Sequence, residues 1–163
     1  MSWPPFVPPG TGAQVTAFGS TYTMKADGAT TAGAYSLVEE EFWGETTPLH
    51  RHINAEEAFF VLSGEVAAWI DGAETLAEPG TFLVVPRGVA HGLRRVSGQP
   101  VRMLTVVSPP GLQGFFDAVA QVGEEQLLVD PQRLVQLASE YGSEILGDYP
   151  GSSDDAGRAV VSE

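Results

Sequence analysis

Cysteine is absent from the 163-residue chain, and this absence excludes several kinds of chemistry at once. Without a thiol there is no disulfide, no thiolate metal ligand and no cysteine nucleophile. Any metal site must therefore be built from nitrogen and oxygen atoms. Histidine, the usual nitrogen ligand, is scarce as well, because the chain contains three.

Basic side chains are the next scarcity, with 8 Lys and Arg against 21 Asp and Glu, a formal net charge of −13. Nucleic-acid phosphates and anionic membrane surfaces repel such a chain, so we expect neither as a partner. The chain also has no apolar run of the roughly 18 residues that a membrane span needs. Its N-terminus lacks the basic and apolar regions of a signal peptide. These absences predict a cytoplasmic protein.

Glycine and proline are plentiful, at 19 and 12 residues, and they suit a chain with many tight turns. Between residues 13 and 110, short apolar runs alternate with turn signals, which predicts an all-β sandwich or barrel. The DG pair at 71–72, between VAAWI and ETLA, is a strong hairpin signal. Before this region, the proline-rich residues 1–12 are expected to form an extended arm.

The spacing of apolar residues changes after position 110. The run LQGFFDAVAQVG has helical periodicity, and DPQRLVQLASEYG predicts a second helix. In that second run Asp130 is a good N-cap, Pro131 fits the first helical position and Gly142 lies at the end. We therefore expect a C-terminal extension with two short helices over residues 111–149. The small, polar residues 150–163 are expected to be a disordered tail.

Two of the three histidines lie together in the stretch TPLHRH. On a strand His50 and His52 point to one face and Arg51 to the other, because side chains alternate with a period of two. A pair of glutamates follows, and only one of Glu56 and Glu57 can face the same interior as the histidines. The pattern predicts a site at which these side chains converge.

The turn residues around these side chains complete two spacing patterns. The first pattern comprises Gly44, His50, His52, Glu57 and Gly64. The second comprises Gly80, Pro86, Gly88 and the third histidine, His91. Both resemble the motifs of the cupin superfamily, although Arg95 stands where the family has an asparagine that is not a metal ligand. The resemblance implies a double-stranded β-helix, or jelly-roll barrel, and makes Glu57 rather than Glu56 the fourth metal ligand.

Three imidazoles and one carboxylate suit one divalent first-row transition metal, namely Ni, Mn, Fe, Co, Cu or Zn. Four protein ligands leave one or two coordination positions open, which allows catalysis at the metal. Strand alternation and the first helix give candidates for an apolar substrate pocket. These are Tyr35, Leu37, Phe59, Val61, Phe82, Val84, Leu93, Met103, Phe115 and Phe116. Periodicity alone does not separate pocket residues from those that fill the barrel.

Several runs, among them GAYSLVEE, EEAFFVLSGEV and PRGVAHGLR, are similar to those of bacterial single-domain cupins described as quercetin dioxygenase-like. Quercetinases open a flavonol ring with dioxygen and release carbon monoxide. The resemblance implies that the metal binds the deprotonated 3-hydroxyl of the substrate, with Glu57 as base or mobile ligand. The predicted function is therefore a metal-dependent dioxygenase acting on a flavonol-like or other enolisable aromatic small molecule.

Two other functions stay open at this point. One is a non-oxidative metalloenzyme of a biosynthetic pathway, such as a cyclase, isomerase or decarboxylase. The other is a non-catalytic cupin that binds a small molecule without turnover. Cupins commonly pair through sheet edges, so we also expect a homodimer in which the N-terminal arm covers an exposed edge. Trp43 and Trp69 are expected in the core or at that interface.

Overall fold

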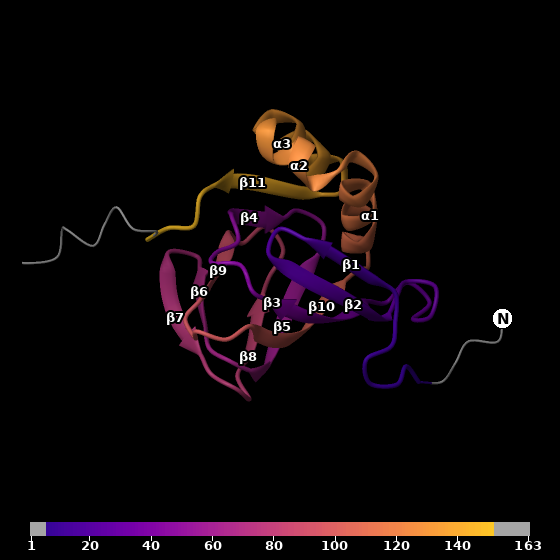
Figure 1. The fold of residues 1–163 in the computed structure, drawn as a ribbon, viewed down its shortest axis with the longest axis vertical. Helices are drawn as coiled ribbons and strands as arrows, with labels where there is room; N and C mark the ends of the chain where they lie inside the picture. Colours follow the sequence, from indigo (N-terminus) through magenta and orange to yellow (C-terminus); the bar gives the residue numbers. More distant parts are fainter. Residues whose placement is uncertain (1–5, 152–163) are drawn as a thin grey trace, which may run out of the picture.

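Two antiparallel β-sheets face each other in the computed structural model, which describes residues 6–151 (Figure 1). In order across the first sheet, the strands are β1 (Gln14–Ala17), β2 (Ser20–Ala26), β3 (Ser36–Phe42), β10 (Val101–Ser108), β5 (Glu56–Ser63) and β8 (Phe82–Val85). Across the second sheet they are β11 (Ser143–Gly147), β4 (Leu49–His52), β9 (His91–Arg95), β6 (Val66–Ile70) and β7 (Ala73–Ala77). Neighbouring strands are often distant in sequence, as in a jelly roll, and the predicted fold class is confirmed.

The core forms because inward-facing residues alternate with outward-facing ones on each strand. On β10, for example, Val101, Met103, Thr105 and Val107 are buried and the residues between them are more exposed. The buried apolar side chains of both sheets meet in one cluster between the sheets. Its members are Phe42, Phe59, Val61, Val66, Ala68, Ala77, Val85, Leu93, Val101 and Met103.

The turn at 71–72 joins β6 and β7 as the sequence predicts. Asp71 has a φ of 49° and Gly72 a φ of 92°. Positive φ at both central residues is the geometry of the type I′ turn that suits a two-residue hairpin. The DG signal therefore fixes the register of this hairpin, in which Ile70 is paired with Ala73.

The C-terminal segment contains three helices, one more than expected, followed by a strand. The helices are α1 (Leu112–Val122), α2 (Glu124–Val129) and α3 (Pro131–Glu140). As predicted, Pro131 opens α3 and the Asp130 side chain caps it, accepting a hydrogen bond from the backbone N–H of Arg133. After α3 the chain returns to the barrel as β11, which pairs with β4. The extension is thus partly an edge of the second sheet.

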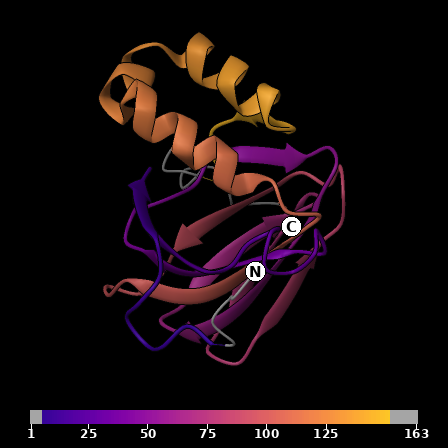
Figure 2. The same cartoon turned by 90° about the vertical axis from the view of Figure 1, so that its right-hand side faces the viewer.

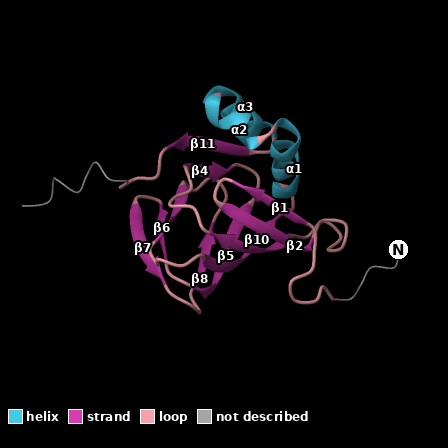
Figure 3. Cartoon of the chain, viewed as in Figure 1, coloured by secondary structure: helices cyan, strands magenta, loops and turns pink. Residues whose placement is uncertain are grey.

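The three helices lie together beyond one end of the barrel (Figures 2 and 3). A second apolar cluster holds them there, and it comprises Ala17 of β1 together with Val119, Leu127 and Leu137 of the helices. No helix of the described residues has the length and apolarity that a membrane crossing requires. Of the predicted arm, residues 6–12 contain no helix or strand. Residues 1–5 and most of the predicted tail lie outside the described residues.

Candidate metal centre

Four side chains from both sheets converge inside the barrel. His50 and His52 on β4 and His91 on β9 belong to the second sheet, and Glu57 on β5 faces them from the first. One ligand atom from each residue can be chosen so that all four lie within 4.8 Å of one another. His50 and His91 are direct partners across the β4–β9 pair, so the strand register itself brings their rings together. The structure thus assembles the four residues that the cupin-like spacing singled out.

Strand alternation sorts the neighbouring residues as predicted. Arg51 turns away from the histidines and forms an ion pair with Glu144, at 2.6 Å between nitrogen and oxygen. Glu56 is exposed and Glu57 is buried. One strand position therefore separates the carboxylate that belongs to the cluster from the one that lies outside it.

A hydrogen bond holds the Nδ1 atom of each histidine ring. Nδ1 of His50 lies 2.9 Å from the carbonyl oxygen of Pro48, and Nδ1 of His91 lies 3.1 Å from that of Val89. A carbonyl oxygen only accepts, so both Nδ1 atoms donate a proton. Nδ1 of His52 lies 2.8 Å from Oγ of Ser143, on β11. These bonds orient the rings and leave Nε2 as the atom available to a ligand.

The Glu57 carboxylate tests whether this arrangement fits a metal. Its Oε2 atom lies 3.1 Å from Nε2 of His52 and 3.0 Å from Nε2 of His91. A neutral imidazole protonated on Nδ1 presents only a lone pair at Nε2, and a lone pair does not bond to a carboxylate. For His91, whose Nδ1 carries a proton, the contact therefore requires a second proton or a metal ion at Nε2. For His52 the Ser143 hydroxyl can donate to Nδ1 or accept from it, so this ring can also donate to Glu57 from a neutral Nε2–H. Three imidazole nitrogens and one carboxylate oxygen fit a divalent first-row transition metal.

The pKa shifts of Glu57 and His50 favour the protonation states that a metal requires, whereas the shift of His52 favours a proton that the metal must displace. Burial would raise the pKa of Glu57, but hydrogen bonds from His52 and His91, and their charges, hold it well below its usual range. Burial lowers the pKa of His50 to about 4, and the nearby His91 adds to the effect. For His52, burial is outweighed by the hydrogen bond and charge of Glu57, which raise the pKa. Near neutral pH the site therefore contains an ionised carboxylate and a neutral His50.

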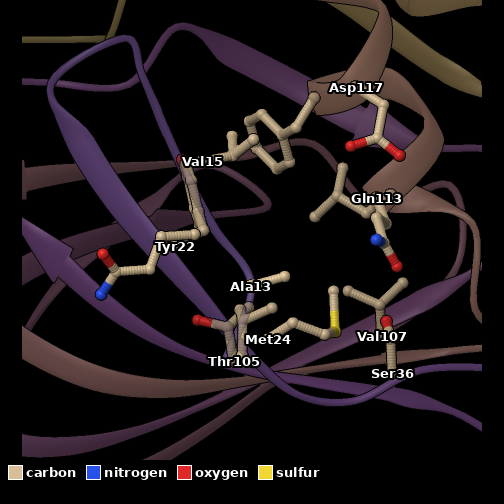
Figure 4. Close-up of a pocket in the computed structure, with 13 residues that line it drawn as sticks. Ala13, Val15, Tyr22, Met24, Ser36, Thr105, Val107, Gln113 and Asp117 are labelled. Atoms are coloured by element: carbon tan, nitrogen blue, oxygen red, sulfur yellow. The ribbon is translucent and has the colours of Figure 1, made fainter. Parts of the chain in front are cut away.

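The cluster lies in the wall of a cavity of about 660 Å³, between the barrel and the helices. This volume is in the usual range of small-molecule sites. Four expected pocket residues line it, namely Phe59, Leu93, Phe115 and Phe116. A neighbouring pocket of about 80 Å³ lies between α1, which contributes Gln113 and Asp117, and the strands of the first sheet (Figure 4). The smaller pocket cannot hold an aromatic molecule of flavonol size, so the larger cavity is the candidate substrate site.

The other six expected pocket residues do not line the larger cavity. Phe82 and Val84 are 61% and 51% exposed on the outer face of β8, because Leu83 and Val85 are the residues of that strand that contact the core. Val61 and Met103 are buried in the apolar core. Leu37 is partly buried on β3, where its neighbours Ser36 and Val38 face inward, and Tyr35 is exposed just before that strand.

Four residues that the sequence reasoning did not assign to the site belong to it. Ser143 orients His52, and Glu40, Tyr22 and Trp43 line the cavity. Trp43, expected in the core or at an interface, is 48% exposed. A signal for Glu40 existed, because it shares the inward parity of Val38 and Phe42 on β3. No comparable signal marked Ser143, whose role depends on the return of the chain as β11.

Residues 43–107 match the family model described as "Cupin domain". Over 106 residues the chain is 30% identical to "Quercetin 2,3-dioxygenase" of Bacillus subtilis (strain 168), which covers 64% of this chain. The chain spans only 31% of the length of that relative.

Solved structures show a similar fold. "The structure of KdgF from Halomonas sp." matches with a TM-score of 0.58 at 16% sequence identity, over 66% of this chain and 94% of that one. The "polyketide cyclase RemF from Streptomyces resistomycificus" matches with a TM-score of 0.50 at 29% identity, over 56% of this chain and 66% of that one. The chain therefore has a cupin-type jelly-roll fold, and its residues 43–107, which contain the cluster of three histidines and one glutamate, match the cupin domain.

Proposed function

We propose that the protein is a metal-dependent dioxygenase that acts on a flavonol-like or other enolisable aromatic small molecule. The observation that carries the proposal is a cluster of three histidines and one glutamate in the wall of a cavity large enough for such a molecule. Phe115 and Phe116 add aromatic surface to that cavity. The similarity to a quercetin 2,3-dioxygenase supports the choice of reaction, although it covers a minor part of that protein.

The Nε2 atoms of His50, His52 and His91 and a carboxylate oxygen of Glu57 would hold the metal. When bound, a divalent first-row metal supplies Lewis acidity to an oxygen of the substrate. The apolar and aromatic walls bind the rings of the substrate and exclude water from them. Glu57 serves as the proton acceptor for the substrate hydroxyl, because a carboxylate released from its histidine partners into an apolar cavity has a raised pKa.

Loss of the near-visible absorbance of a flavonol is the first test. Protein loaded in turn with Ni, Mn, Fe, Co, Cu and Zn is incubated aerobically with quercetin, and carbon monoxide in the headspace is measured. We expect turnover with at least one metal and none with a His91→Ala variant. Absence of turnover with all six metals contradicts the flavonol assignment. A Glu57→Gln variant that binds metal and keeps full activity contradicts the base role of Glu57.

A non-oxidative cyclisation is the second candidate, and the 29% identity to a polyketide cyclase favours it. Both reactions begin with an enolisable aromatic or polyketide-like molecule, so the same cavity suits either. They differ in their need for dioxygen. Turnover of such a molecule under strictly anaerobic conditions would support the cyclase, and strict dependence on dioxygen would support the oxygenase.

A further inference from the structure

A second buried carboxylate, Glu40, lies in the wall of the same cavity. It is 4% exposed, on the inward face of β3. Its Oε1 atom accepts a hydrogen bond from Oγ of Ser20 at 2.8 Å, and its Oε2 atom accepts one from Oγ1 of Thr105 at 3.0 Å. Neither bond, nor any other described contact, makes it part of the metal cluster. The proposed function assigns it no role.

No cation balances Glu40. Within the described residues, the cavity is lined by four acidic side chains and by no Lys or Arg. The acidic residues are Glu40, Glu57, Glu124 and Asp148. Lys25 on β2 and Arg102 on β10 belong to the two strands that flank β3. Both form ion pairs with Glu39, which faces outward, rather than with Glu40. Burying a carboxylate without a cation beside it costs free energy of folding. Its presence in the cavity wall therefore indicates a functional role.

The groups packed around Glu40 favour its neutral form. Burial raises the pKa of Glu40 to about 7, against opposing hydrogen bonds from Ser20 and Thr105, and the charge of Glu57 adds to the rise. Tyr22 lies directly opposite on β2, and burial and the charge of Glu40 raise its pKa well above the usual value. The Tyr22 ring is stacked on Phe116 of α1 at 4.1 Å, which holds it between the barrel and the helix. The pair is therefore a neutral phenol beside a carboxyl group that titrates near neutral pH.

The two buried glutamates of the cavity thus have opposite properties. Glu57 is held by Nε2 of His52 and of His91, whereas Glu40 is held by the hydroxyl groups of Ser20 and Thr105, in surroundings that raise its pKa. When environments drive two carboxyl groups apart in this way, one is suited to stay ionised and the other to exchange a proton.

We propose that Glu40 is a second acid–base group of the cavity, on which the proton of a phenolic or enolic hydroxyl resides once such a ligand is bound, so that Glu57, the first acceptor of this proton in the proposed reaction, returns to its ionised state. The ligand class rests on the proposed function, whereas the acid–base role rests on the position of Glu40. The hydroxyl O–H bond breaks, its electron pair stays on the ligand oxygen, and the proton moves to a carboxylate oxygen of Glu40. Tyr22, which remains protonated, is placed to donate a hydrogen bond to the resulting carboxyl group or to the ligand.

The charges of the cavity are consistent with this transfer. Among the buried groups, a divalent cation and the Glu57 carboxylate leave one positive charge, which an ionised Glu40 balances; Glu124 is only partly buried and Asp148 is exposed to solvent. A ligand that gives its proton to Glu40 adds one negative charge and removes another, so the sum is unchanged. A buried site favours such a neutral balance, because an uncompensated charge in a low dielectric is costly.

An infrared pH titration of metal-free protein tests the acid–base role without any ligand. We expect a carbonyl band from a buried carboxylic acid that disappears with a midpoint near pH 7. The band should be missing in Glu40→Gln and present in Glu41→Gln, the matched control, since Glu41 is exposed on the same strand. Absence of the band from the wild type, or its persistence in Glu40→Gln, overturns the proposal.

Anaerobic binding of 3-hydroxyflavone, which has one ionisable hydroxyl, tests the transfer itself. Between about pH 7 and the pKa of the free ligand, wild-type affinity should be nearly independent of pH, because the proton stays in the complex. The Glu40→Gln variant, loaded with metal to the same level, must release that proton, so its affinity should fall about tenfold for each pH unit lowered. Equal pH dependence in the two proteins overturns the proposal.

The remaining outcomes separate this inference from the proposed function. Wild-type binding with the expected pH dependence, but without turnover when air is admitted, removes the dioxygenase and keeps the role of Glu40. A wild type that binds no 3-hydroxyflavone at any pH contradicts both the flavonol assignment and this ligand class for Glu40.

Discussion

The two ends of the barrel interior are built from the same strands and differ completely in chemistry. On β5, Val61 belongs to the apolar core and Glu57 to the metal cluster. On β3, Phe42 belongs to the core, and Glu40, two positions away, lines the cavity. On β10 the corresponding pair is Met103, in the core, and Thr105, which is hydrogen-bonded to Glu40. On each of these strands, only one or two inward-facing positions therefore separate the residue that packs in the core from the residue that belongs to the polar site.

The difference indicates which end stabilises the fold. Close-packed apolar side chains at one end supply the hydrophobic free energy. At the other end every buried side-chain nitrogen and oxygen of the described residues has a hydrogen-bond partner, which limits the cost of burying them. Charged groups around a cavity still contribute little net stability, as is common at functional sites. Substitutions at the two ends should therefore affect different measurements.

The largest effect should follow from removing a metal ligand at the polar end. His91 is 1% exposed and its Nε2 atom faces Glu57. His91→Ala should lower metal affinity by more than the roughly 10–100-fold typical of losing a supporting partner. Metal analysis and calorimetric titration measure the loss. The control is Glu56→Gln, which changes the exposed neighbour of Glu57. Stoichiometric metal with unchanged affinity in His91→Ala would contradict the assignment of the site.

At the apolar end the expected effect is on stability. Met103 is fully buried among Phe42, Phe59 and their neighbours. Met103→Ala should reduce the free energy of unfolding by about 2–5 kcal/mol through lost burial and a new cavity. Urea unfolding of metal-free protein measures this change. Phe82→Ala, at a 61% exposed position, should cost far less. If the two variants are equally destabilised, the core has been placed at the wrong end.

Because of Glu40, the free energy of unfolding of the metal-free protein should depend on pH. Its pKa rises from 4.5 to about 7 on folding, so between these values the folded state binds more protons than the unfolded state. The free energy of unfolding therefore falls as pH rises through this window, by roughly 3 kcal/mol in total. Metal-free Glu40→Gln should be more stable than wild type at pH 8 by up to about this amount, and nearly equal to it at pH 5. A stability difference that is the same at both pH values would contradict the burial of an ionisable Glu40.

Much of the fold and of the metal cluster could be predicted because both depend on local patterns. Alternation placed Arg51 outside, and the motif spacing selected Glu57 over Glu56. Alternation failed on β8, where the run FLVV is apolar at every position and either parity is possible. Alternation also gave no signal within the run EEE, which is polar at every position. Only the neighbouring Val38 and Phe42 indicate that Glu40 is its buried member.

The helical cap was less predictable because its structure depends on distant contacts. The segment SEILG forms β11 through pairing with β4, about 90 residues earlier in the chain. Short strands of this kind take their conformation from the partner strand rather than from their own propensity. The homodimer stays a prediction, which light scattering at micromolar concentration measures.

The smallest effect should come from the contact by which the cap supports the polar end. Oγ of Ser143 lies 2.8 Å from Nδ1 of His52, and both side chains are buried. Ser143→Ala removes the partner that fixes the ring, so metal affinity should fall roughly 10–100-fold with little loss of stoichiometry at high metal. Ser143→Thr, which keeps the hydroxyl, should restore much of the affinity, and Ser139→Ala, at an exposed helical position, should change nothing. A merely structural role for Ser143 would lower the stability of metal-free protein in Ser143→Ala while leaving metal affinity unchanged. Since Ser143 belongs to β11, the expected result would mean that the barrel supplies the metal ligands and the C-terminal extension holds one of them in place.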